Sequence, residues 1–541
     1  MADIVSRIYS NFRGVDFRGE EINLARSPDS LNVWKDYKQT ESICTRPGME
    51  LVQAIAGPVY GIWFYKGSML VHADHTLYTI AAGIPELLYA DGVPEVIYED
   101  VNPAHSNGFI YEDVFYLMDG KHYLQYDGTT REDGTPNIKE VEGYVPTTSI
   151  GEGGGTTYQD ANMLTGRRIN TFLGDYSTLD FYLDAQDIDT DFAPIIKIDG
   201  KVDSGYTVDY TKGIISFTKA PDAPGTDGQD NISVEFCKTV PKYRESICGC
   251  TLLQVFDNRV FVSGNPDFPN VVWHCSLNDP TYFSDLDYYR EGMDEAQVKG
   301  MTAGNNALWV FREPSGANTN VFYHTPALDD EYGKIYPSCH SSVTIGCVGK
   351  AINFNDDIVF FSGRGMEGIS GDVTTEQMAA HRSSLVDSRL ITEKGYKDMI
   401  LEEWEGYLFV FIGNKAYLAD SRAVFSNENH MEYEWFYWEM EKNITCARVQ
   451  DGVLYLGTDD GIYTLTDNKS PLKSYWVTPK DKFKYPHRLK TTNKRGCVAE
   501  ATGDVSVYSP TALLVSMMPM SFARLGLPIC VSFSPRHRTR F

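Results

Sequence analysis

The chain lacks the long apolar runs and paired cysteines that mark several protein classes. No run of eighteen apolar residues occurs in its 541 residues, so we expect no membrane-spanning helix and no membrane anchoring. The first residues, Met1-Ala-Asp-Ile-Val-Ser-Arg, contain no apolar core of a secretory signal. The ten cysteines are scattered and form no pair of Cys-x-x-Cys units, which disfavours a zinc site. These features predict reduced, buried thiols in a protein made in a cytosol.

Basic residues are scarce relative to acidic ones. The chain has 48 Lys and Arg against 74 Asp and Glu, a net charge of −26. A protein that grips nucleic acid over its whole surface needs cations to neutralise phosphates, so the sequence disfavours that class and also docking on anionic lipid. A negative surface instead suits solubility, or a channel through which DNA slides without sticking.

Catalytic motifs are missing as well. The sequence has no Gly-x-Ser-x-Gly, no phosphate-binding P-loop and no His-Glu-x-x-His. The Asp-box of sialidase propellers is absent, since Asp459-Asp-Gly-Ile-Tyr463 is only a turn, and no carboxylate pair stands out among 74 acidic residues. We therefore predict no catalytic residue, no cofactor and no resident metal, and expect that the protein is not an enzyme.

Two cysteines and an acidic stretch have spacings that could carry chemistry, and each has a simpler interpretation. Cys248-Gly-Cys250 is the tightest cysteine pair, but buried, reduced thiols are the simpler interpretation. The stretch Asp184–Asp191 places carboxylates at alternating positions, as calcium loops do. A calcium loop starting at Asp187 needs Gly at position six and Glu at position twelve, where this chain has Phe192 and Ile198. A solvated acidic loop is therefore preferred.

Histidines and tyrosines give two further candidates. In His72-Ala-Asp74-His75, an extended strand would place residues 72 and 74 on one face and His75 on the other, which makes a poor metal site. Four tyrosines in one segment could stack on sugars, although core packing and hairpin pairing are the simpler interpretations. These tyrosines are Tyr176, Tyr182, Tyr206 and Tyr210.

What the chain has in abundance is a repeat. Seven short polar turns separate pairs of apolar, aromatic-rich runs at intervals of roughly 48 residues, apart from one gap of about 145 residues. The turns are Lys66–Gly67, Glu112–Asp113, Asp257–Asn258, Asn305–Asn306, Asp356–Asp357, Glu405–Gly406 and Asp451–Gly452. This period predicts an all-β chain that forms a β-propeller of six or seven blades.

The long gap predicts an insertion. Five or more alternating strands between 145 and 240 suggest a small β-sandwich that opens with a flexible linker, Gly151-Glu-Gly-Gly-Gly155. We expect an N-terminal segment (1–57), the first blades (58–144), the inserted sandwich (145–240), the remaining blades (241–511) and an atypical basic tail (512–541). Closure of the ring requires a strand from either the N-terminal segment or the stretch 473–511.

The C-terminal tail differs in composition from the rest. No acidic residue follows Asp504, whereas four arginines accumulate: Arg524, Arg536, Arg538 and Arg540. Two hypotheses remain open: a change of reading frame replaced the native end, which we favour, or a genuine basic tail contacts DNA or a neighbouring subunit.

Several segments resemble virion proteins of tailed bacteriophages. They are Asn32-Val-Trp with Thr45-Arg-Pro-Gly48, Ser263-Gly-Asn-Pro-Asp-Phe-Pro-Asn270, Cys275-Ser-Leu-Asn-Asp-Pro-Thr-Tyr-Phe283 and Ala161-Asn-Met-Leu-Thr-Gly-Arg-Arg-Ile-Asn-Thr-Phe172. They are similar to scaffold motifs of propeller-type packaged-DNA stabilisation, head–tail connector and tail tubular (nozzle) proteins. The resemblance covers about 20–480, and the C-terminus departs from it.

The resemblance implies a structural virion protein, made in the host cytoplasm and placed at the head–tail junction or tail. It implies a ring, commonly of six copies, that is stacked below the portal and adaptor and seals or extends the channel through which the genome leaves during ejection. The strong negative charge fits transient passage of double-stranded DNA through an acidic channel. The first alternative is a host-surface or glycan-binding tail adhesin, and the second is a carbohydrate-active enzyme.

Overall fold

The structure is a computed structural model of the whole chain. It describes residues 11–18, 23–37, 43–81, 92–225, 228–329, 333–370, 378–427, 430–467, 473–479, 504–508 and 530–534. Two compact units contain them: a first unit of Met1–Pro103, Lys299–Tyr323 and Cys339–Phe541, and a second unit of Ala104–Val298 and His324–Ser338. Within the described residues, no helix is long and apolar enough to cross a membrane.

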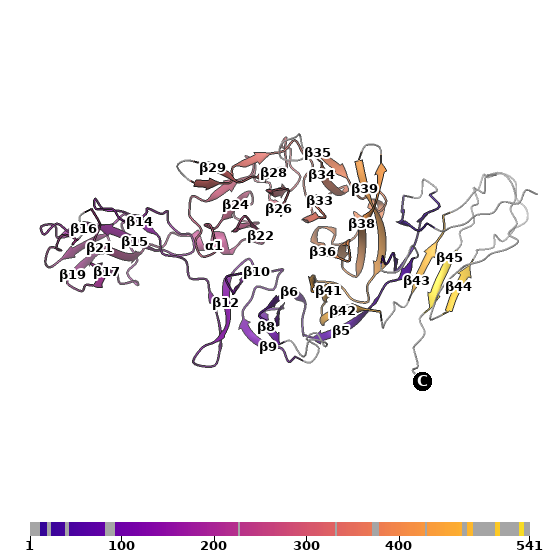
Figure 1. Ribbon diagram of the computed structural model, residues 1–541, viewed down its shortest axis with the longest axis horizontal. Helices are drawn as coiled ribbons and strands as arrows, with labels where there is room; N and C mark the ends of the chain where they lie inside the picture. The colour runs from indigo at the N-terminus through magenta and orange to yellow at the C-terminus, as the bar shows by residue number, and fades with distance from the viewer. Residues whose placement is uncertain are drawn as a thin grey trace, which may run out of the picture. The chain divides into compact units, whose positions relative to one another are not determined.

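Four-stranded sheets dominate both units (Figure 1). The first unit holds β6 Val59–Tyr65, β7 Ser68–Ala73, β8 Thr76–Ala81 and β9 Glu95–Glu99; β32 Ala351–Phe354, β33 Asp357–Ser362, β34 Gly365–Ser370 and β35 Met378–His381; and β36 Ile400–Trp404, β37 Tyr407–Ile412, β38 Lys415–Asn427 and β39 His430–Glu439. The second unit holds β10 Asn107–Tyr111, β11 Val114–Met118, β12 Tyr123–Thr130 and β13 Pro136–Glu140; and β22 Leu252–Phe256, β23 Arg259–Ser263, β24 Val271–His274 and β25 Tyr288–Arg290.

Two more sheets complete a set of seven among the described residues. One joins β26 Val298–Gly304, β27 Ala307–Arg312, β28 Val321–His324 and β31 Ser338–His340. The other joins β40 Cys446–Gln450, β41 Val453–Gly457 and β42 Gly461–Thr466 to β5 Gly48–Ala54 from the N-terminal segment. The fold is therefore a β-propeller whose blades are these seven sheets.

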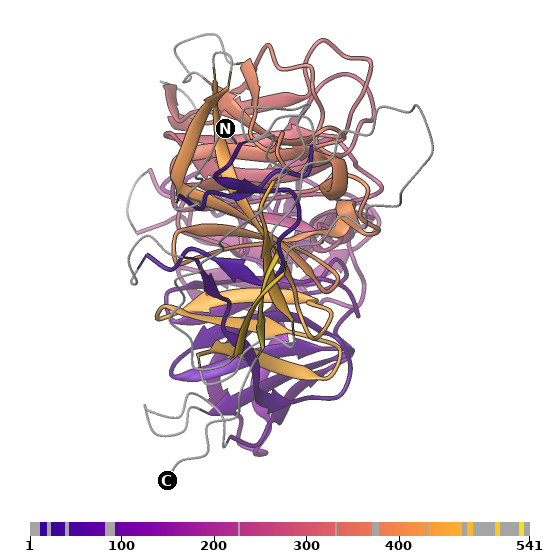
Figure 2. The ribbon, with the colours of Figure 1, turned by 90° about the vertical axis from the view of Figure 1, so that its right-hand side faces the viewer.

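The strand that completes the last blade comes from the N-terminal segment and not from 473–511. β5 pairs antiparallel with β42, from Gly48 opposite Thr466 to Ala54 opposite Gly461. Both ribbon views show the indigo β5 beside the orange β42 (Figures 1 and 2). One blade is thus built from strands about 400 residues apart, which ties the start of the chain to its C-terminal half.

The first hairpin of each blade turns as the sequence predicts. Both central residues have positive φ in six of the predicted pairs, for example 47° and 76° at Lys66 and Gly67. This is the type I′ geometry that matches strand twist and favours Asn, Asp and Gly. The fifth turn is Asn355–Asp356, one residue earlier than predicted, because Asp357 is the first residue of β33 and pairs with Phe354.

The segment 145–240 forms two sheets around one core. The first joins β14 Thr147–Ser149, β15 Arg167–Phe172, β21 Ile232–Cys237, β17 Ile195–Ile198 and β18 Lys201–Val202; the second joins β16 Asp180–Tyr182, β20 Ile214–Phe217 and β19 Tyr206–Asp209. Phe181 and Phe217 from the smaller sheet share a buried cluster with Ile196 and Val234 from the larger one. We call this segment the insert.

The glycine-rich stretch that opens the insert is not the flexible linker that its composition suggests. The amides of Gly151 and Gly153 donate to the carboxylate of Asp230 at 2.7 and 2.9 Å, and Thr171 Oγ1 donates to the same group at 2.7 Å. The amide of Asp230 in turn donates to the Gly154 carbonyl at 2.9 Å. Carboxylate–amide bonds thus fix this loop against the end of the larger sheet.

Short elements connect and flank the blades. These are β1 Gly14–Val15, β2 Arg26–Ser27, β3 Val33–Trp34, β4 Cys44–Thr45, β29 Ala327–Asp329, β30 Gly333–Ile335, α1 Tyr243–Cys248, α2 Asp387–Leu390 and the 3₁₀ turn Tyr396–Asp398. β43 Ser474–Val477, β45 Cys530–Ser534 and β44 Asp504–Tyr508 form a three-stranded sheet. Apart from β45, the tail 512–541 lies outside the described residues, so both hypotheses about it stay predictions.

Candidate functional site

The cysteine pair lies in the core of the second unit. Cys250 is fully buried and Cys248 nearly so, among residues such as Val262 and Trp273. Burial raises the pKa of Cys248 to about 12 and that of Cys250 well above its ordinary value. Both thiols therefore stay protonated at neutral pH and are poor nucleophiles and metal ligands.

The histidine motif does not gather into a site. Asp74 and His75 form the turn between β7 and β8, with Asp74 at φ 50°, so the extended strand assumed for residues 72–75 is wrong beyond residue 73. His72 is buried, with Nε2 at 2.9 Å from the Asp74 carbonyl oxygen. His75 Nδ1 lies 3.2 Å from the Val101 carbonyl oxygen. The two rings thus serve separate backbone groups.

The acidic stretch of the insert directs its carboxylates at separate partners. Asp189 accepts from the amide and hydroxyl of Thr239 at 2.9 and 2.6 Å, whereas Asp184 lies 3.8 Å from an Arg168 guanidinium nitrogen. No group of three or more His, Cys, Asp or Glu that could hold a metal ion occurs in the part of the chain that the structure describes.

The four insert tyrosines separate into two pairs. Tyr206 and Tyr210 pack against the buried cluster of the insert, and Tyr206 Oη donates to the Pro194 carbonyl at 2.7 Å. Tyr176 and Tyr182 are each 67% exposed. Only the second pair is available for contact with a ligand.

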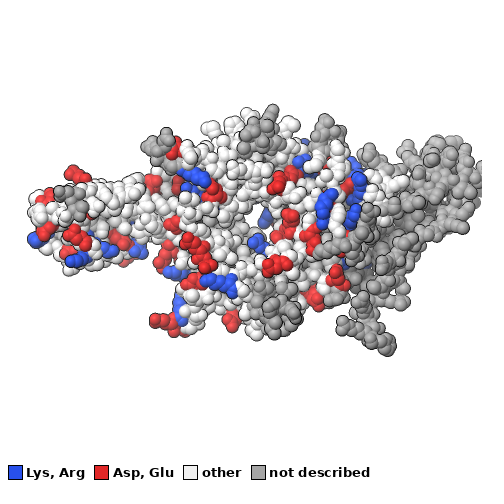
Figure 3. Space-filling view, in the orientation of Figure 1, with Lys and Arg blue, Asp and Glu red and all other residues white. Residues whose placement is uncertain are grey.

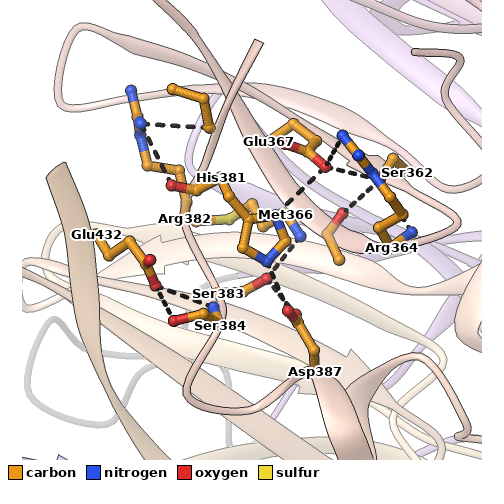
Figure 4. Close-up of polar contacts among 12 residues, drawn as sticks. Ser362, Arg364, Met366, Glu367, His381, Arg382, Ser383, Ser384, Asp387 and Glu432 are labelled. Carbon is orange, nitrogen blue, oxygen red and sulfur yellow. Dashed lines mark hydrogen bonds and ion pairs between the residues drawn. The ribbon is translucent and has the colours of Figure 1, made fainter. Parts of the chain in front are cut away.

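A network of charged residues that the sequence analysis missed connects β34, β35 and α2 in the first unit (Figure 4). His381 lies between two carboxylates, with Nε2 2.5 Å from Asp387 Oδ2 and Nδ1 3.3 Å from Glu367 Oε1. Ser383 Oγ donates to Asp387 Oδ1 at 2.6 Å and accepts from the Met366 amide at 2.7 Å. We call this group the His381 cluster.

The His381 cluster contains Ser, His and Asp but lacks the geometry of a catalytic triad. In a triad the serine hydroxyl donates to the imidazole, which acts as the base. Here Ser383 donates to the carboxylate, and both imidazole nitrogens face carboxylates. Burial alone would lower the pKa of His381, but its bonds to Asp387 and Glu367 outweigh that effect and raise the pKa to about 10. The ring is a cation at neutral pH and has no lone pair to accept a proton.

Backbone geometry confirms how tightly the His381 cluster is packed. Gly365 has φ +135°, and a Cβ atom there would lie 2.2 Å from Asp387 Oδ1 and 2.5 Å from Ser383 Oγ. No side chain fits, so glycine is required for the hairpin before β34 to reach α2.

An ion pair with its neighbouring hydrogen bonds links adjacent blades of the same unit. Arg382 donates to both oxygens of Asp357 at 2.8 and 3.3 Å and to the Met431 carbonyl at 3.0 Å. Tyr433 Oη donates to Asp357 Oδ2 at 2.8 Å. The sheet β32–β35 is thereby joined to β39 of the next sheet through a fork-shaped guanidinium–carboxylate pair.

The second unit has its own buried ionisable pair. His324 and Glu291 are both fully buried, with His324 Nε2 2.9 Å from Glu291 Oε1. His324 Nδ1 donates to the Tyr336 carbonyl at 2.9 Å, and Ser338 Oγ donates to Glu291 Oε2 at 2.7 Å. Burial lowers the pKa of the nearby His274 to about 4, so that ring is neutral. These side chains hold strand ends together.

One hollow on the described surface, of about 330 Å³, is polar and partly paired internally. It is lined by Asn414, Glu441, Lys442, Asn443, Asp459 and Asp460. Glu441 accepts from Arg46 at 2.8 Å, and Lys442 donates to Asp460 at 2.7 Å. Figure 3 shows acidic residues spread over the visible face with basic ones among them, and no single basic patch.

Comparisons with known proteins find similarity in the fold only. No family model and no curated protein matches the sequence. Among solved structures, the chain is similar to PorZ of Porphyromonas gingivalis (9% identity, TM-score 0.34, 80% of this chain covered), of whose length it spans 42%. It is also similar to BamB of Moraxella catarrhalis, with 10% identity and a TM-score of 0.35 over 77% of this chain and 97% of that one. A third similar structure is YCF48 bound to a D1 peptide, with 6% identity and a TM-score of 0.36 over 79% of this chain and 98% of that one. At these identities and scores, none of them informs function.

Proposed function

We propose that the chain is a non-catalytic structural protein of a tailed-phage virion, a ring-forming component of the head–tail junction or tail nozzle. The observation that carries the structural part is the mutual pairing of the charged groups: in the His381 cluster and in the Arg382–Asp357 pair, they bind one another and join adjacent elements. Groups that are paired with one another in this way hold a scaffold in place and are poorly suited to act as a nucleophile or base. The phage assignment is supported by the resemblance of the sequence motifs.

The distribution of charge refines the proposal. The first strands of the seven blades, β6, β10, β22, β26, β32, β36 and β40, carry only two basic residues, Lys299 and Arg448, and two acidic ones, Glu402 and Glu403. The net charge of −26 therefore resides elsewhere on the chain. We place the acidic conduit for DNA between copies of the chain, in a homo-oligomer, commonly a hexamer, that contacts portal and adaptor proteins.

The test is the mass and shape of the purified full-length protein. Mass photometry combined with negative-stain electron microscopy should give a ring with a central channel and a mass of about 365 kDa, six times 60.8 kDa. Because a ring of this kind could assemble only on its portal, the same measurement is repeated with the portal–adaptor complex of the phage that encodes the chain. A 60.8 kDa monomer in both measurements would overturn the proposal and leave the adhesin alternative.

The adhesin alternative is kept because one observation favours it. Tyr176 and Tyr182 expose most of their rings to solvent on the insert, whereas aromatic side chains in the blade cores are buried. Exposed aromatic rings among polar groups are a common means of contact with ligands.

A further inference from the structure

The smaller sheet of the insert has one covered and one open face. Along β16, β20 and β19, alternate side chains point into the core of the insert, including Phe181, Ile215 and Phe217. The residues between them point the other way and are exposed or half-buried, as the alternation of strand side chains requires. No other part of the described chain is seen to pair with the edges of this sheet.

The strand register sets two rows of side chains on the open face. In the first row, Tyr182 lies opposite Ile214, and Ile214 lies opposite Asp209. In the second row, Asp180 lies opposite Ser216, and Ser216 lies opposite Thr207. Neighbours in a row are about 4.8 Å apart from strand to strand, so each row spans roughly 10 Å. The first row thus carries an aromatic ring, an aliphatic side chain and a carboxylate, and the second row carries one carboxylate and two hydroxyls.

The polar row is preorganised, and the aromatic ring is free. Ser216 Oγ donates to Asp180 Oδ1 at 2.5 Å, which holds the two side chains together, and Asp180 is exposed. Tyr182 is 67% exposed although its neighbour Phe181 is buried. A sugar can make two kinds of contact with such a surface. The C–H face of a pyranose is attracted to the negative face of an aromatic ring, and its hydroxyls donate to carboxylates.

Charge limits which ligand can occupy this face. The insert carries 15 acidic and 7 basic residues, a net charge of −8, and the ammonium of Lys212 lies 3.5 Å from Asp209, a member of the first row. Phosphate, sulfate or uronate groups would be repelled. We propose that the open face of β16–β20–β19 binds a neutral oligosaccharide, with Tyr182 stacked on a sugar ring and Asp180, Ser216 and Thr207 bonded to its hydroxyls. The proposal goes beyond the ring function and would hold for a virion ring and for a free adhesin alike.

The test uses the full-length protein and a defined set of probes. Cello-, malto-, xylo- and manno-hexaose serve as neutral ligands, heparin hexasaccharide as an anionic one and hexalysine as a cationic one, each titrated to 10 mM by saturation-transfer NMR. We expect at least one neutral hexaose to bind, with little change in affinity between 50 and 500 mM NaCl because no charge is neutralised. Tyr182→Ala should weaken that binding at least tenfold, and Asp180→Asn should weaken it less.

Tyr158→Ala is the matched control. Tyr158 is also on the insert and 59% exposed, but it lies beside the larger sheet, where the amide of its neighbour Gln159 donates to the Thr147 carbonyl. Its loss should leave the affinity unchanged. The proposal is overturned if no neutral hexaose binds, if binding survives Tyr182→Ala, if Tyr158→Ala weakens it equally, or if only hexalysine or heparin binds. Circular dichroism of each variant verifies that the fold is intact.

Discussion

A propeller blade and the smaller sheet of the insert use the same strand alternation for opposite purposes. In β37, Leu408, Val410 and Ile412 enter one buried cluster, whereas the residues between them enter another: Tyr407, Phe409 and Phe411. Both faces of the blade are therefore packed against neighbours. In β16, Phe181 is buried and Tyr182 is exposed, so only one face is covered. A sheet buried on both faces can be a scaffold, whereas a sheet with one open face can bind a ligand.

The difference in burial predicts the largest stability effect in the blades. Trp438 on β39 is fully buried, packs against Trp34 at 5.2 Å between ring centroids and donates its Nε1 hydrogen to the Val33 carbonyl at 3.2 Å. Trp438→Ala should lower the free energy of unfolding by about 4 kcal/mol or more, because it leaves a cavity and an unpaired carbonyl. Urea denaturation followed by circular dichroism measures this. A loss below about 1 kcal/mol would show that the N-terminal segment is not packed on this blade.

The next effect tests the ion pair between blades. Asp357→Ala would leave the Arg382 guanidinium buried without its carboxylate and remove the acceptor of Tyr433 Oη. We expect a loss of about 3–5 kcal/mol in unfolding free energy, since an unpaired buried charge is costly. Glu99→Ala, an exposed carboxylate on β9 of the same unit, is the control and should change stability by less than about 0.5 kcal/mol. Equal effects of the two changes would contradict a special role for the pair.

The His381 cluster gives a smaller, pH-dependent effect. The pKa of His381 is raised to about 10 in the folded chain, against about 6.5 when unfolded, so folding favours the protonated ring. Its contribution is complete below pH 6.5 and is lost as the pH rises through 10. His381→Gln should therefore reduce stability most near pH 6, and the gap to the unmodified protein should narrow towards pH 10. Denaturation midpoints of both proteins from pH 6 to 10 give this difference in stability. A difference that stays constant with pH would contradict the ion pairs of His381 with Asp387 and Glu367.

The repeat could be predicted from the sequence because each turn depends on two adjacent residues. The charged clusters could not be predicted, because their residues are brought together only by tertiary contacts. Type I′ turns need residues that tolerate positive φ, so six turn positions could be predicted from pairs such as Asn305–Asn306. The fifth was misplaced by one residue because Asn-Asp-Asp offers two equivalent pairs, and the sequence does not show that Asp357 begins β33 and pairs with Phe354.

Distant contacts account for the other errors. Glu367, His381 and Asp387 meet only because β34 and β35 pair in a register that places Glu367 opposite His381. The glycine-rich stretch 151–155 was taken for a linker because its composition does not reveal that Asp230, nearly eighty residues later, binds its amides. Contacts of this kind depend on tertiary pairing, which composition and spacing do not encode.

The smallest effect is the sharpest test of the comparison, because it sets two adjacent residues of one strand against each other. Phe181→Ala removes a buried ring and should destabilise the insert by about 3 kcal/mol. Tyr182→Ala removes a ring that is already in water, so stability should change by less than about 0.5 kcal/mol. Hydrogen exchange of the insert amides measures both in the full-length protein. If Tyr182→Ala also destabilised the insert, the Tyr182 ring would be part of the packing of the insert. That result would contradict a binding role for the open face.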